Sequence, residues 1–191
     1  MGVRTRLILP LLAAATLAGC GASTPARNAA PSSHDVTAAF SGSAPMLAAV
    51  HAQGNQMLGG GLSAFRARLA ALHGYPVVVN KWASWCGPCQ SEFPVFQRTA
   101  VIFGRRVAFL GIDANDGTGQ TGGAFLRRFP VTYPSFTDPR SVIAGAVGAS
   151  TYFPQTLFYA AADHHSYVFD HAGPYESVAA LARDIRRYLL R

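Results

Sequence analysis

The sequence predicts an α/β protein in which helices cover a central sheet. The apolar, largely β-branched runs 77–79 and 107–112 are typical of strands buried on both faces. Apolar residues recur at helical spacing in 63–72 and again in 177–190. Strands and helices alternate at first, and a hairpin and a last helix follow, so we expect one central mixed sheet.

The composition is that of a globular chain. Its 191 residues are 50% hydrophobic and include 3 cysteines, which excludes a disordered chain, a collagen-like chain and a disulfide-rich miniprotein. The length suits one domain with appendages. The formal net charge is +7, but no basic stripe interleaved with aromatic residues marks a nucleic-acid groove. We therefore expect no nucleic-acid partner.

The N-terminal residues have the three parts of a secretory signal peptide in order, with positive charge first, then an apolar run and then small residues. Arg4 and Arg6 precede the apolar run 7–18, whose 12 residues are too few for a membrane-spanning helix, which needs about 20. The letters LAGC at 17–20 resemble the bacterial lipoprotein box, in which the cysteine is lipidated and becomes the new N-terminus. Residues 1–19 are therefore predicted to be a lipoprotein signal peptide.

Cys20 is the predicted site of lipidation, and the alternative is an ordinary cleaved signal with this cysteine near the cut. Residues 20–45 are mostly Ala, Ser, Pro and Gly, which bury too little surface to offset their ordering entropy. We expect them to form a disordered tether for a domain spanning 46–191. The predicted location is the extracytoplasmic side of a membrane, held there by the lipid.

The elements of the domain follow from spacing and from end signals. Phe65, Leu69 and Leu72 predict a helix over 63–72, with Ser63 as its cap and Gly74 at its end. The other predicted elements are strands at 75–80, 107–112, 155–160 and 166–170, helices at 90–103, 120–129 and 177–190, and a hairpin turn at 161–165.

Two cysteines separated by two residues lie between a predicted strand and the helix behind it. Such a pair can close a small disulfide when the first cysteine begins the helix. Backbone N–H groups and the helix dipole favour a thiolate there, so we expect Cys86 to be the exposed nucleophile. Cys89 should be buried and should resolve a mixed disulfide by attacking Cys86. Pro88 fits the first turn, where a missing N–H costs little.

Metal binding is the alternative use of the two cysteines. A structural zinc site needs four ligands, and the sequence has no second cysteine pair. His164 and His165 are adjacent and would point to opposite faces of a strand. A copper(I) site of two thiolates and a histidine stays open, as does an inert disulfide. We predict no metal and no separate cofactor, because the Cys86–Cys89 disulfide is itself the redox group.

The segment NKWASWCGPC at 80–89 resembles the active-site segment of thioredoxin-like proteins, and QSEFP at 90–94 narrows this to the TlpA/ResA/DsbE-like extracytoplasmic branch. VTYP at 131–134 and FPQTLF at 153–158 match later parts of that branch in order. The resemblance covers roughly 61–191. It implies a thioredoxin-like three-layer α/β/α sandwich and the activity of a thiol-disulfide oxidoreductase.

The resemblance also implies roles for residues around the cysteines. Trp85, Gly87 and Pro88 would belong to the active-site loop. Pro154 would be a cis-proline opposite the disulfide, in a loop that receives an extended substrate segment. Phe153 would flank the substrate groove and influence selectivity.

Proton transfer is the point at which the sequence departs from cytosolic thioredoxins, which carry a buried Asp at the position of Asn80. Asn cannot exchange a proton near neutral pH, so Cys89 needs another group or water. Glu92 lies three residues beyond Cys89 and could serve if burial raises its pKa; the alternative is a solvent-facing Glu92. Lys81, the single lysine of the chain, is expected to be a solvated charge at a strand end, and the alternative is a position near the site.

The predicted function is the reduction of disulfides in envelope proteins, with apocytochrome c among the candidate substrates. The Gly-Pro pair between the cysteines resembles reducing thioredoxins, whose potential lies near about −270 mV. Because no nicotinamide or flavin fingerprint is present, electrons would come from a membrane partner. The alternatives are an envelope disulfide oxidase and a copper-carrying or non-catalytic binding lipoprotein. We expect a monomer.

Overall fold

The structure is a computed structural model that describes residues 1–2, 31–117 and 119–190. Cys20 and most of the predicted signal peptide fall in 3–30 and so lie outside the described residues. Within the described part of the chain, no helix is long and apolar enough to cross a membrane.

A six-stranded mixed sheet forms the centre of the fold. Its order is β1-β4-β3-β2-β5-β6. The first four strands in this order are parallel, and β5 and β6 are each antiparallel to the strand before them. The central strands β2 and β3 are buried at every residue, as their apolar runs predict. The strands are β1 (Met57–Leu58), β2 (Val77–Trp82), β3 (Ala108–Ala114), β4 (Ser135–Asp138), β5 (Gln155–Tyr159) and β6 (Phe169–Ala172).

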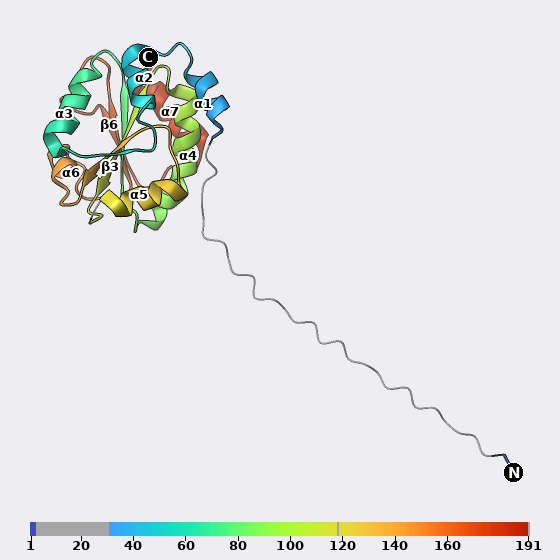
Figure 1. The fold of residues 1–191 in the computed structure, drawn as a ribbon. Coiled ribbons are helices and arrows are strands. Elements are labelled where there is room, and N and C mark those ends of the chain that lie inside the picture. Colours follow the sequence, from blue (N-terminus) through green and yellow to red (C-terminus); the bar gives the residue numbers. More distant parts are fainter. Residues whose placement is uncertain (3–30, 118, 191) are drawn as a thin grey trace.

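Helices cover both faces of this sheet, which confirms the predicted three-layer α/β arrangement (Figure 1). On one face α4 packs against α7 and α1, and on the other α3 packs against α6. The ring of Trp82 lies edge-on to Phe93 of α4 and stacks on Phe125 of α5, so α5 shares the α4 face. The helices are α1 (Ser33–Phe40), α2 (Pro45–His51), α3 (Gly61–Ala71), α4 (Gly87–Phe103), α5 (Gly119–Arg128), α6 (Val142–Ala146) and α7 (Val178–Leu189).

The last residues of β2 determine which side chains point to each face of the sheet beside the site. Side chains alternate between the faces of a strand. Asn80 bonds Glu92 of α4, and Trp82 contacts the same helix, so both point to the α4 face. Lys81 lies between them and therefore points to the opposite face. The strand is followed directly by the loop that carries the cysteines.

The N-terminal boundary of the domain differs from the prediction. Helix α1 lies inside the range expected to be a disordered tether, so that prediction is wrong for 33–40. The ring of Phe40 stacks on His51 of α2 with centroids 3.5 Å apart. Both rings sit on Gly104, where an added Cβ would lie 2.5 Å from Phe40 and 2.8 Å from His51. A long-range contact of this kind leaves no periodic pattern in the sequence.

Several element ends also differ. Helix α3 begins at Gly61 after an N-cap at Gly60, so Ser63 is not its cap. The last strand covers Phe169–Ala172 and not 166–170. Strands β1 and β4 were not predicted, because two and four residues are too few to show an alternating pattern.

Candidate active site

The two cysteines lie at the start of α4, as their position after a strand predicts. Cys86 is the N-cap residue, and its Sγ accepts a hydrogen bond from the backbone N–H of Cys89 at 3.1 Å. The pair forms a disulfide with its Cα atoms 5.2 Å apart. Pro88 lies in the first helical turn, where no N–H is needed. In the reduced state the same N–H groups and the helix dipole would stabilise a Cys86 thiolate.

The exposure of Cys86 differs from the prediction. Cys86 is 3% exposed and Cys89 is fully buried, so the expected contrast between an open and a hidden cysteine is absent from this disulfide form. In this form the Cys86 sulfur is bonded to that of Cys89 and accepts the Cys89 N–H at the start of the helix. The exposed residues of the loop are Trp85, which is 56% exposed, and Gly87 and Pro88.

An aromatic pair borders the cysteines. The rings of Trp85 and Phe153 lie 5.0 Å apart, and the Trp85 indole N–H donates to the Asn115 carbonyl at 3.0 Å. The Phe153–Pro154 peptide bond is cis, as predicted. The Pro154 carbonyl accepts a hydrogen bond from the N–H of Gly173 at 2.9 Å. The segment before β5 is thus held beside the cysteine loop, while substrate binding by Phe153 and Pro154 stays a prediction.

Glu92 is buried one turn beyond Cys89, so the solvent-facing alternative is wrong. Its Oε1 accepts a hydrogen bond from Asn80 Nδ2 at 2.9 Å, and its Oε2 accepts one from the backbone N–H of Tyr175 at 3.1 Å. Burial raises the pKa of Glu92 to about 8, although both hydrogen bonds act in the opposite direction. A carboxyl group in this state can exchange a proton near neutral pH.

Lys81 is not a solvated charge, contrary to the prediction. Its side chain is 0% exposed. Its Nζ lies 3.6 Å from the centroid of the Phe153 ring and has no hydrogen-bond partner among the described residues. Burial lowers the pKa of Lys81 to about 8. The alternation of β2 could have suggested burial, because Val79, two residues before Lys81 on the same face of the strand, is apolar.

Two aspartates near the site were missed at the sequence level. Asp116 anchors the cysteine loop, because its carboxylate accepts from the backbone N–H and from the hydroxyl of Ser84, both at 2.7 Å. Asp113, at the end of β3, is buried beneath Gly122 of α5. Burial raises the pKa of Asp113 to about 9, and the nearby Asp116 and Asp138 add to this shift. Asp113 is therefore protonated at neutral pH.

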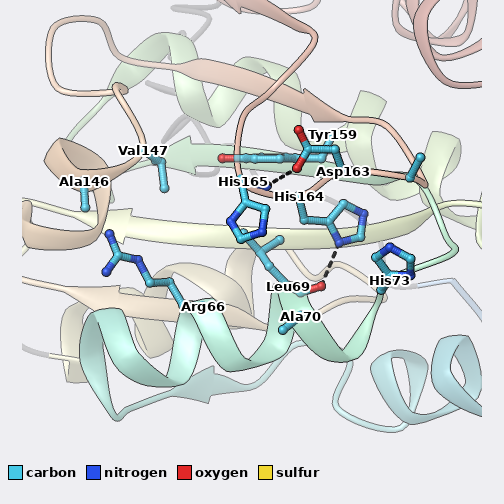
Figure 2. A pocket seen from close by; sticks show the side chains of 11 residues that line it. Arg66, Leu69, Ala70, His73, Ala146, Val147, Tyr159, Asp163, His164 and His165 are labelled. Atoms are coloured by element: carbon cyan, nitrogen blue, oxygen red, sulfur yellow. Dashed lines mark hydrogen bonds between the residues drawn. The ribbon is translucent and has the colours of Figure 1, made fainter.

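A separate cavity of about 680 Å³ lies near the opposite end of β2 (Figure 2). His164 and His165 lie in the loop between β5 and β6, where the sequence predicts a hairpin turn at 161–165, and His73 lies just beyond α3. The ring nitrogens of His164 lie 2.7 and 3.0 Å from the carbonyl oxygens of Leu69 and Tyr75. This histidine therefore joins the loop to the segment that enters β2, far along the strand from the cysteines.

The described residues do not form a set of ligands for a metal ion. Across 31–117 and 119–190, no three His, Cys, Asp or Glu side chains are placed to hold a metal ion. The nitrogens of His164 already face backbone carbonyls, which leaves the imidazole without a free lone pair directed at the cysteines.

Sequence comparisons place this chain among thioredoxin-like proteins. A model of the AhpC/TSA family matches residues 61–174. The thiol-disulfide oxidoreductase ResA of Oceanobacillus iheyensis is 30% identical over 67 residues, which cover 35% of this chain and 35% of the relative. The chloroplastic M-type thioredoxin of Brassica napus is 32% identical over 78 residues, covering 40% of this chain and 44% of the relative. This chain therefore spans less than half the length of either relative.

Solved structures agree with this placement. A DsbF homologue from Corynebacterium diphtheriae is 26% identical with a TM-score of 0.56, covering 62% of this chain and 75% of that one. The MTB dsbF structure is 27% identical with a TM-score of 0.54, and the match covers 62% of this chain and 84% of that one. DsbE from Chlorobium tepidum shares the fold, with 21% identity and a TM-score of 0.57. The match covers 63% of this chain and 84% of that one. With its cysteine pair at a helix start and a family match over more than half its length, this chain belongs to the thioredoxin-like AhpC/TSA family.

Proposed function

We propose that this protein is an extracytoplasmic thiol–disulfide oxidoreductase that reduces disulfides of envelope proteins through Cys86 and Cys89. The observation that carries the proposal is the position of Cys86, whose sulfur accepts the Cys89 N–H at the start of α4. The exposed ring of Trp85, whose centroid lies 5.0 Å from that of Phe153, offers an apolar surface beside it. The similarity to ResA and DsbF supports the same chemistry.

The reaction is a pair of thiol–disulfide exchanges. The Cys86 thiolate attacks one sulfur of the substrate disulfide, which forms a mixed disulfide and releases one substrate thiolate. The Cys89 thiolate then attacks the Cys86 sulfur, which closes the Cys86–Cys89 disulfide and releases the second substrate thiolate. The substrate gains two electrons and, after protonation, two protons, and the cysteine pair is oxidised. A membrane electron-transfer partner would return those two electrons.

Glu92 is the proposed proton acceptor for Cys89. Cys89 is buried, so its thiol must lose a proton to a nearby group or to water before it can attack. Glu92 lies on the same helix, three residues on, and the amide of Asn80 holds one of its oxygens. The raised pKa of Glu92 matches a proton exchanged near neutral pH.

The direction of electron flow is tested by the midpoint potential of the cysteine pair. Gly87 and Pro88 between the cysteines favour a reductase by their similarity to reducing thioredoxins. Equilibration of the full chain in glutathione buffers should give a midpoint below about −200 mV. A midpoint above about −150 mV would instead support the alternative of an envelope disulfide oxidase.

Two further assignments belong to the same proposal. Lipidation at Cys20 would anchor the protein, and Cys20→Ala should move it from the membrane fraction to the soluble fraction and remove the mass of the acyl groups. A role in cytochrome c maturation predicts that cells lacking this protein accumulate oxidised apocytochrome c.

The copper-carrying alternative predicts tight stoichiometric binding in an anaerobic copper(I) titration of the reduced protein.

A further inference from the structure

Lys81 is a buried charge that the proposed exchange does not use. It is the single lysine in the chain and lies one residue before the end of β2. It is fully buried, and its Nζ has no hydrogen-bond partner within the described residues. An ammonium without water or a partner is costly. Such a group is retained most often where a function requires it.

The surroundings of Lys81 supply no hydrogen-bond acceptor for its ammonium within the described residues. The face of the Phe153 ring, 3.6 Å from Nζ, replaces water only in part. Across the β2–β5 ladder, Lys81 is paired with Gln155. The Gln155 side-chain amide donates to Asp170, and its Oε1 accepts no hydrogen bond in the described structure. The pKa of Lys81 is lowered by burial alone, with no contribution from an acidic neighbour.

Phe153 connects this ammonium to the proposed substrate surface. Its ring is half-buried and lies close both to Nζ of Lys81 and to the exposed Trp85 ring, whose centroid is 5.0 Å away. It also directly precedes Pro154, at the start of β5. A substrate segment that lies on the Trp85–Phe153 pair would therefore contact the ring that lies against Nζ.

We infer that Lys81 is a specificity-determining residue whose ammonium pairs with a carboxylate of the substrate segment next to the target disulfide. This inference rests on the proposed function and adds to it a substrate class, acidic segments. A carboxylate satisfies a buried ammonium better than any neutral acceptor. After removal of the predicted signal peptide with Arg4 and Arg6, basic residues still outnumber acidic ones, which adds a long-range attraction for acidic partners.

Two matched peptides test the inference. Each contains the same intramolecular disulfide, with Glu next to one cysteine in the first peptide and Gln in the second. The full chain, recycled with dithiothreitol, should reduce the Glu peptide with a kcat/KM about 10-fold higher than the Gln peptide. Lys81→Met keeps the apolar stem but lacks the charge, and it should reduce both peptides equally.

The control is another cation over an aromatic ring. Arg186 lies over Phe103, 5.2 Å from the ring centroid, on the exposed side of α7. Arg186→Gln removes one positive charge from the protein and should leave the preference for the Glu peptide intact. Equal rates for the two peptides with the wild-type chain would overturn the role of Lys81 while leaving the proposed function standing. Reduction of neither peptide would instead count against the proposed function.

A spectroscopic measurement keeps the test independent of whether Lys81→Met folds. Because the chain has one lysine, isotope-labelled lysine gives a single side-chain signal in NMR. A version of each peptide with one cysteine, activated as a mixed disulfide with thionitrobenzoate, reacts with Cys86 of the Cys89→Ser protein, releases thionitrobenzoate and leaves a stable peptide–Cys86 disulfide. The Lys81 signal should shift to that of a paired ammonium with the Glu peptide and should differ clearly with the Gln peptide. Identical Lys81 signals in the two complexes would overturn the inference.

Discussion

The side-chain amide of Asn80 donates a hydrogen bond of 2.9 Å to the carboxyl of Glu92, in the buried layer between β2 and α4. This contact joins a residue that cannot titrate to one whose pKa burial raises to about 8. The buried carboxyl group that we propose as the proton acceptor therefore lies on the helix that carries the cysteines, and not on the strand. Asn80 orients this group, and the N–H of Tyr175 holds its second oxygen.

Glu92→Gln should remove a pH dependence from the resolving step. Glu92 accepts a proton only when ionised, so release of the substrate from Cys86 should accelerate as the pH rises through about 8. In the Gln variant this rise should be absent, and the rate at high pH should fall about 100-fold. Stopped-flow decay of a mixed disulfide between pH 6 and 9 measures both effects. Glu176→Gln, at the exposed second Glu of the chain, is the matched control; if both variants keep the wild-type profile, Glu92 does not transfer the proton.

Stability should decrease as the pH rises from about 5 to about 8. In the unfolded chain Glu92 and Asp113 lose their protons near their ordinary pKa values of 4.5 and 3.8, whereas in the folded protein they hold them to about 8 and about 9. The folded state therefore binds more protons in this window, and raising the pH favours unfolding. Urea unfolding at each pH should show the decline. Glu92→Gln and Asp113→Asn should each make it shallower, and an undiminished slope in both would contradict the raised pKa values.

Lys81 should act in the opposite direction at higher pH. Its pKa is about 8 in the folded protein against 10.5 in the unfolded chain, so between these values the unfolded chain binds the extra proton. Stability from this group therefore increases as the pH rises from about 8 to about 10.5. Lys81→Met should remove that contribution, which comparison of the wild-type and variant unfolding curves across this range would measure. A constant difference between the two curves would show that burial does not perturb Lys81.

Phe153→Ala should weaken substrate binding with little effect on chemistry. Removing the ring takes away one half of the Trp85–Phe153 pair, and no reacting atom is involved. We expect KM for a disulfide peptide to rise about 10-fold with kcat within about twofold, the effect of losing an aromatic contact at an interface. Ile102→Ala, an exposed apolar residue near the far end of α4, should leave both constants unchanged. A fall in kcat with constant KM would assign Phe153 to the exchange step instead.

Asp116→Ala should destabilise the protein more than Ser84→Ala does. The Asp116 carboxylate accepts from both the backbone N–H and the hydroxyl of Ser84, whereas Ser84→Ala removes only the hydroxyl bond. The first change should cost about 2 kcal/mol and the second about 1 kcal/mol. Urea midpoints at constant m-value give both numbers. Equal losses would mean that the backbone bond contributes nothing to the anchoring of the cysteine loop.

Gly104→Ala should release α1 from the domain. Its Cβ would meet the ring of Phe40 and the carbonyl of Ala100 at distances too short for any side chain, so the Phe40–His51 stack must open. Hydrogen exchange should become faster in 33–40 and stay unchanged in β2 and β3. Gly145→Ala, a helical glycine with open space around it, is the control. Unchanged protection of 33–40 would show that α1 does not depend on this contact.

The sequence by itself determined the central strands of the sheet and the cysteine pair of the candidate active site. The apolar runs that became β2 and β3 are buried at every position, and burial on both faces needs no partner beyond the sheet and its helices. Cys86 and Cys89 were identified by spacing alone, because a helix start imposes the same geometry in any fold. Pro154 was identified by resemblance and lies in a cis bond.

Tertiary structure alone decided the protonation and partners of the site. Whether Glu92 faced solvent or Asn80 depended on how α4 packs on β2, and the burial of Lys81 depended on Phe153, which is 72 positions away in the chain. The order of 33–40 likewise followed from rings that meet over Gly104. Local sequence sets backbone preference and helix dipoles, whereas the pKa of a buried group depends on desolvation by residues brought together only in the folded chain.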